Sequence, residues 1–194
     1  DVVRRLAKLG YLAIAPELFV RQGDVLKLSS VEEIRAVVAK VPDAQVFSDL
    51  DATLAWAVRS SQGNIDRGGI TGFCWGGCIT WLYAAYTPKV KAGVAWYGRL
   101  VGKSTALTPK HPVDIAPTLS VSVLGLYGGK DTGIPLESVE KVRALLKSGR
   151  SKSEIVMYPE APHAFFADYR PSFREKEAKD GWERLQKWFK SHGL

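Results

Sequence analysis

Two patterns of hydrophobic positions alternate along the chain, one typical of buried strands and the other of amphipathic helices. Short runs that are mostly apolar along their length predict five strands, at Tyr11–Ala15, Ile70–Phe73, Val90–Tyr97, Val121–Tyr127 and Glu154–Tyr158. Apolar residues that recur every three or four positions predict helices over Val2–Leu9, Val31–Val41, Asp43–Arg59, Trp75–Tyr86, Pro135–Lys147 and about Phe173–His192. Residues 98–118 contain prolines and lysines without such a pattern, and we expect a long loop there.

The order of these elements predicts an α/β fold. Strands that alternate with helices and are apolar on both sides are typical of a mostly parallel sheet covered by helices on both faces. With 194 residues, 46% of them hydrophobic and 24% charged, the chain is long enough for one globular domain with its own core. No repeat, low-complexity tract or linker interrupts it, so we expect a single domain over residues 1–194.

The charge changes this interpretation little. The chain has 27 Lys and Arg against 20 Asp and Glu, a formal net charge of +7, and the basic residues are scattered among acidic ones. No basic block, zinc-finger spacing or RNA-binding aromatic signature is present, so we expect no nucleic-acid partner. No run approaches the roughly 18 apolar residues that span a bilayer, so we expect no membrane partner either.

The two cysteines, Cys74 and Cys78, are too few for a disulfide framework or a structural metal site. This usage is typical of a reducing compartment, and we expect a cytoplasmic protein; a targeting signal before Asp1 is the alternative. A redox role for the pair is an alternative, although thiol oxidoreductases use the spacing C-x-x-C and here three residues intervene.

The residues directly after the second predicted strand carry the strongest chemical pattern. Gly72-Phe73-Cys74-Trp75-Gly76 fits the turn G-x-nucleophile-x-G, in which a strand runs directly into a helix and flanking side chains would clash. The turn places Cys74 at a helix N-terminus, which favours its thiolate, and aims the backbone N–H of Trp75 at a developing oxyanion. The alternative is a tight glycine turn with a small buried cysteine.

A nucleophile requires a base, and the base requires an acceptor that orients it. Asp131 follows the fourth predicted strand and His163 follows the fifth, so both are expected at the same edge of the sheet as Cys74. The order nucleophile, acid, histidine is the order found in α/β-hydrolases. We therefore predict a catalytic triad of Cys74, Asp131 and His163; the other histidines, His111 and His192, are expected to be surface residues.

The chain resembles the dienelactone hydrolase (carboxymethylenebutenolidase) family of α/β-hydrolases. The resemblance extends over nearly the whole sequence and is carried, in family order, by Ala15–Phe19, Arg21–Asp24, Gly72–Gly77, Trp96–Gly98, Tyr127–Asp131 and Tyr158–Phe165. It implies that the triad hydrolyses a small-molecule lactone or ester through a thioester acyl-enzyme, without a metal or organic cofactor. We expect a monomer or a small homo-oligomer.

Four further residues lie near strand ends or in the facing loop and are candidates to line the substrate pocket: Arg21, Tyr97, Tyr127 and Phe165. For each of them, ordinary packing or a surface charge is the alternative. A different class of function also stays open, a non-catalytic α/β-hydrolase-fold protein that binds a small ligand.

The sequence departs from the family at two places. Members carry an arginine shortly after the catalytic histidine that helps to bind a substrate carboxylate, whereas here the fourth residue after His163 is Ala167, and Arg170 comes later. The family also has an earlier strand and loop, with a glutamate near the nucleophile and a second oxyanion donor, and nothing here corresponds to them. We therefore expect that an N-terminal portion of two or three strands precedes Asp1.

Overall fold

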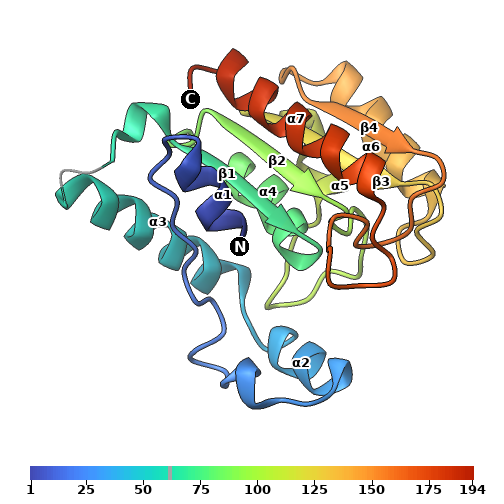
Figure 1. Cartoon of the computed structure of the whole chain (residues 1–194), viewed down its shortest axis with the longest axis horizontal. Helices are drawn as coiled ribbons and strands as arrows, with labels where there is room; N and C mark the ends of the chain where they lie inside the picture. The colour runs from blue at the N-terminus through green and yellow to red at the C-terminus, as the bar shows by residue number, and fades with distance from the viewer. Residues whose placement is uncertain (61–62) are drawn as a thin grey trace. The chain divides into compact units, whose positions relative to one another are not determined.

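The structure of the protein, a computed structural model, describes residues 1–60 and 63–194. The contacts within the chain divide these residues into two compact units. Figure 1 colours the chain from its N-terminus to its C-terminus. The first unit comprises Asp1–Ile65 and Thr105–Pro109, and the second comprises Asp66–Ser104 and Lys110–Leu194.

The second unit contains a sheet of four parallel strands. They are β1 (Gly69–Phe73), β2 (Ala92–Trp96), β3 (Ser122–Gly128) and β4 (Glu154–Tyr158), arranged in the order β1-β2-β3-β4. The last residues of the first two strands, Phe73 and Trp96, are paired, and so are Gly128 and Tyr158 at the ends of the other two. All four carboxyl ends therefore meet at one edge of the sheet, where ligands of such sheets bind.

Helices cover both faces of this sheet. Neighbouring residues of β3 show it: Gly125 lies against Trp81 of α4 (Trp75–Tyr86), whereas Leu126 lies close to Gly181 of α7 (Glu175–Ser191). Because successive side chains of a strand point to opposite faces, α4 and α7 lie on opposite sides. In Figure 1 α7 crosses in front of the strands. Burial on both sides explains why β2 and most of β3 are apolar, and helices on both faces of a parallel sheet confirm the predicted α/β class.

The segment expected to be one long loop contains helical turns. Pro112 begins α5 (Pro112–Ile115), which continues into the 3₁₀-helix η3 (Ala116–Thr118). His111 is the N-cap residue of α5: its carbonyl accepts the backbone N–H of Asp114 at 2.9 Å, and the Asp114 carboxylate accepts the N–H of His111 at 2.8 Å. His111 is half-buried, not a surface residue as expected, because it begins a short helix that a proline at the first position and the Asp114 carboxylate stabilise. After β3, α6 (Leu136–Ser148) precedes β4.

The first unit is helical. It contains α1 (Val2–Lys8), the 3₁₀-helix η1 (Val25–Lys27), α2 (Val31–Val38) and α3 (Asp43–Arg59), and η2 (Ile65–Arg67) follows where the unit ends. A capping box begins α2: Ser30 Oγ accepts the N–H of Glu33 at 3.1 Å, and the Glu33 carboxylate accepts the N–H of Ser30 at 3.0 Å.

The predicted strand Tyr11–Ala15 is wrong. These five residues are irregular and pair with no described strand. Leu12 and Ile14 are 42% and 38% exposed, so their side chains are not enclosed as those of a buried strand would be. A short apolar run without periodicity does not distinguish a strand from an extended connection, which explains the error.

The core of the second unit is built mainly from β2, β3 and the helices against them. Its largest fully buried side chains include Trp81, Trp96, Tyr127 and Phe165. Across the described part of the chain, no helix has the length and apolar character needed to cross a bilayer.

Candidate active site

Cys74 lies at the junction where β1 passes directly into α4. Its backbone has φ +55° and ψ −116°, a left-handed conformation that is rare for a non-glycine residue. The Cys74 N–H donates to the carbonyl of Trp96 at 3.0 Å, and its own carbonyl accepts the N–H of Gly77 at 3.0 Å, the first bond of the helix. These bonds hold the strained residue in place, and the residue stays exposed to solvent.

Glycines allow the close approach that this junction requires, but not at both expected positions. A Cβ on Gly72 would lie 2.2 Å from the carbonyl oxygen of Gly76, and one on Gly77 would lie 2.5 Å from the carbonyl oxygen of Trp96. A Cβ on Gly76 would meet nothing within 4 Å. The expectation that glycine is sterically required on both sides of the nucleophile is therefore correct for Gly72 and wrong for Gly76; the second tight position is Gly77.

Asp131 and His163 meet at the carboxyl ends of β3 and β4. The His163 Nδ1–H donates to Asp131 Oδ2 at 2.6 Å, and the other carboxylate oxygen, Oδ1, accepts the N–H of Gly133 at 2.8 Å. The Asp131 side chain is 1% exposed and that of His163 is 38% exposed. A buried carboxylate thus fixes one nitrogen of a ring that remains accessible to solvent.

The imidazole of His163 also faces the thiol of Cys74, and the contact changes the pKa of both groups. Hydrogen bonds to Asp131 and then to Cys74 raise the pKa of His163 to about 9, against the opposing effect of partial burial. The hydrogen bond from His163 is the main cause that lowers the pKa of Cys74, and the charge of His163 and the N–H of Trp75 lower it further. An opposite charge and hydrogen bonds both stabilise the charged form of each group. The arrangement favours a thiolate beside an imidazolium.

Arg170 contributes to the positive electrostatic field at Cys74, a role that the sequence reasoning did not assign to it. Its charge lowers the pKa of Cys74, and the guanidinium lies 5.4 Å from the ring centre of Tyr169. The sequence signal for Arg170 was a basic residue a few positions after His163. Such a signal is too general to identify a role by itself.

The other predicted site residues lie in different surroundings. Tyr97 lies edge-on to His163, with 5.1 Å between ring centres. Tyr127 and Phe165 are fully buried; the Tyr127 hydroxyl accepts the indole N–H of Trp81 at 3.0 Å, and Phe165 packs against neighbouring aromatic rings. In this conformation both are packing residues, and their contact with a substrate stays a prediction.

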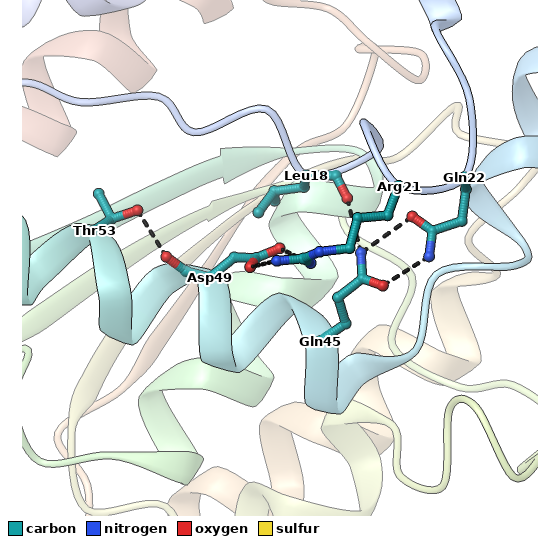
Figure 2. A network of polar contacts seen from close by, with 6 residues as sticks. All are labelled: Leu18, Arg21, Gln22, Gln45, Asp49 and Thr53. Carbon is teal, nitrogen blue, oxygen red and sulfur yellow. Dashed lines mark hydrogen bonds and ion pairs between the residues drawn. The ribbon is translucent and has the colours of Figure 1, made fainter.

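Arg21 belongs to the first unit, where its guanidinium is engaged by α3. Its two terminal nitrogens lie 2.7 and 2.6 Å from the two carboxylate oxygens of Asp49, as Figure 2 shows. The amides of Gln22 and Gln45 bond to each other at 2.7 and 3.1 Å beside this pair. These contacts tie the loop to the helix. A role for Arg21 in binding substrate stays a prediction.

His192, expected at the surface, is half-buried at the end of α7. Its ring centre lies 4.6 Å from that of Trp188, and its Nδ1–H donates to the Trp188 carbonyl at 2.7 Å. Within the described ranges, no group of three or more His, Cys, Asp or Glu side chains is placed to hold a metal ion.

A surface hollow of about 310 Å³ lies next to the loop that carries Asp131, but none of Cys74, Asp131 and His163 lines it. Its walls come from the segment after β2 and the start of α6: Arg99, Leu100, Val101, Gly133, Ile134, Pro135, Glu137, Ser138 and Lys141. The exposed thiol therefore opens elsewhere than into this hollow.

Comparison with known proteins places the chain in a family of hydrolases. Residues 1–193 match the model of the dienelactone hydrolase family. A protein of Methylorubrum extorquens named "Putative carboxymethylenebutenolidase" is 59% identical over 195 residues, which cover 100% of this chain and 67% of the relative.

Solved structures agree. The crystal structure of a Klebsiella pneumoniae protein described as a "Putative Dienelactone Hydrolase" is 56% identical, has a TM-score of 0.94, and covers 98% of this chain and 79% of its own. A dienelactone hydrolase-like promiscuous phosphotriesterase from metagenomic libraries shares the fold at 20% identity, with a TM-score of 0.73 and coverage of 97% and 78%.

Proposed function

The chain belongs to the dienelactone hydrolase family of α/β-hydrolases, and from that premise we propose that it hydrolyses a lactone or an activated carboxylic ester with Cys74 as nucleophile. The observation that carries the proposal is the continuous contact from the buried carboxylate of Asp131 through His163 to the exposed thiol of Cys74. Nucleophile, base and orienting acid in hydrogen-bond reach are the general signature of covalent catalysis.

The first half of the reaction forms a thioester. The Cys74 thiolate attacks the carbonyl carbon, and the negative charge that develops on the carbonyl oxygen is stabilised by the backbone N–H of Trp75. The carbon–oxygen bond to the leaving group then breaks, and His163, held as an imidazolium by Asp131, donates its proton to the departing oxygen. In a lactone that oxygen stays attached to the acyl group, so the ring opens on the enzyme.

The second half releases the acid. Neutral His163 accepts a proton from water, the resulting hydroxide attacks the thioester carbonyl, and the carbon–sulfur bond breaks to restore the thiolate. Because a thiolate is itself a good leaving group, the acylation step favours substrates whose alcohol leaves easily. Enol lactones and aryl esters fit this requirement, and amides fit it poorly.

The test compares two cysteine variants in the hydrolysis of p-nitrophenyl acetate and of an enol lactone. Cys74→Ala should lower kcat/KM by at least about 100-fold, because the residue that forms the covalent bond is removed. Cys78→Ala is the matched control: that side chain lies one turn further into α4, and we expect a rate close to that of the unchanged protein.

Equal rates for the Cys74→Ala variant and the unchanged protein would overturn the assignment. If neither protein hydrolyses either substrate above the rate of buffer, the alternative of a non-catalytic binding protein is favoured.

A further inference from the structure

Tyr97 is the first residue after β2, and its backbone is held in a strained conformation from two sides. Its φ of +37° lies in the left-handed region, which is costly for an aromatic residue. Its N–H donates to the carbonyl of Leu126 at 2.8 Å. The next residue, Gly98, packs so closely on α4 that an added Cβ would lie 2.3 Å from the backbone nitrogen of Cys78. The fold thus fixes the backbone from which the Tyr97 side chain extends.

The side chain of Tyr97 contacts the turn that carries His163 at two residues. The ring lies edge-on to His163 at 5.1 Å and to Phe165 at 5.3 Å between centres. Tyr97 as a whole is 3% exposed. The turn itself contains a second left-handed residue, Ala164, with φ +58°. A strained turn persists only where surrounding contacts determine it, and Tyr97 supplies two of them.

His163 needs such support because Asp131 holds it at one atom. Asp131 fixes the ring at Nδ1 alone, and the His163 side chain is 38% exposed, so packing does not enclose the ring. Proton transfer requires the second nitrogen to stay in line with the sulfur of Cys74, and catalytic groups lose efficiency when their rotamers are not locked.

We infer that Tyr97 is a positioning residue of this site: its ring limits the tilt of the His163 imidazole and packs on Phe165 in the turn that carries it. The inference rests on the proposed function of Cys74 and His163. It differs from a role in lining the substrate pocket, because it acts through His163 and predicts a change in the reactivity of the thiol without any substrate.

The experiment measures two properties of Tyr97 variants: the kinetics of p-nitrophenyl acetate hydrolysis, and the pH at which alkylation of Cys74 by iodoacetamide is half-maximal. All proteins carry Cys78→Ala, so that the measured alkylation is that of Cys74. In Tyr97→Leu, which removes the ring edge and the hydroxyl, we expect kcat to fall by about 10-fold or more with KM changed less than threefold. The alkylation midpoint should rise, because a tilted imidazole stabilises the thiolate less.

Tyr97→Phe keeps the ring and removes only the hydroxyl. Because the ring makes the contacts with His163 and Phe165, kcat and the midpoint should stay closer to those of the parent protein than in Tyr97→Leu. If Tyr97→Leu does not fold, Tyr97→Asn replaces it, since asparagine tolerates the left-handed backbone.

Trp182→Leu is the control for lost packing. Trp182 lies on α7 and stacks on Phe166 at 5.9 Å, so its removal should lower stability and leave the alkylation midpoint unchanged. An unchanged midpoint in Tyr97→Leu, or a rise in KM alone, would overturn the positioning role. If Cys74→Ala itself leaves turnover intact, the proposed function fails instead, and the two failures are distinguishable.

Discussion

At the scale of single residues, the reactivity of the protein depends on the charge of one thiol. The pKa of Cys74 is lowered chiefly by its hydrogen bond with His163, and the pKa of His163 is raised to about 9 chiefly by Asp131. Between these two pKa values the pair exists as thiolate and imidazolium. As the pH rises through about 9, His163 loses its proton, so the leaving group no longer receives it and acylation should slow.

Replacing Asp131 by asparagine tests this coupling. Asp131→Asn keeps the shape of the buried side chain but removes the charge that raises the pKa of His163, so imidazolium is lost at lower pH and thiolate forms at higher pH. The midpoint of Cys74 alkylation against pH should therefore rise toward that of an ordinary thiol. The measurement is the iodoacetamide rate from pH 5 to 10 in a Cys78→Ala background. A midpoint that does not move in Asp131→Asn would contradict the chain of contacts.

At the scale of elements, the passage from β1 into α4 determines where Cys74 lies. The turn leaves no space at Gly72, whose Cβ would lie 2.2 Å from the Gly76 carbonyl, yet it leaves open space at Gly76. This asymmetry was not visible in the sequence, where the two glycines flank the cysteine in the same way.

The difference between these two glycines gives a prediction about stability. Gly72→Ala should lower the free energy of unfolding by about 1–3 kcal/mol, because the methyl group overlaps a backbone carbonyl that cannot move without distorting the turn. Gly76→Ala should raise it by about 0.5–1 kcal/mol, because alanine replaces glycine inside a helix without a clash. Urea unfolding followed by circular dichroism measures both. Equal effects of the two substitutions would contradict the described turn.

The elements that the sequence predicted well are those with strong local signals. The helix Trp75–Tyr86 has the predicted bounds, since a glycine turn precedes it and Pro88 follows it. The prediction of a strand at Tyr11–Ala15 was wrong because a strand needs a neighbouring strand to pair with, and a local hydrophobic pattern does not reveal that neighbour. The helix at Pro112 was missed because it is only 4 residues long and its N-cap residue is a histidine, which is not a usual capping residue.

At the scale of the whole molecule, parallel topology explains why distant residues meet. Cys74, Asp131 and His163 follow β1, β3 and β4, and all carboxyl ends lie at one edge of the sheet. Their proximity was predictable from the sequence because strand order and direction follow from alternating elements. The contacts of Tyr97 were not predictable in the same way, since they depend on left-handed backbone conformations at strand ends.

The two units differ in their burial. Among the described residues, the buried apolar side chains of the first unit are Val41 and Val46, whereas the second unit contains the remainder, from Ile79 to Phe189. The residues proposed for catalysis all belong to the second unit, and Arg21, predicted to contact substrate, belongs to the first.

The most direct test of the central claim is to find the acyl group on the protein. During turnover of p-nitrophenyl acetate, the reaction is stopped with acid, which preserves thioesters, and the protein is measured by intact mass and peptide mapping. We expect one added acetyl group, located on Cys74 and absent from the Cys74→Ala variant. Continued hydrolysis without acetyl on Cys74, or the same acetylation in the variant, would contradict it.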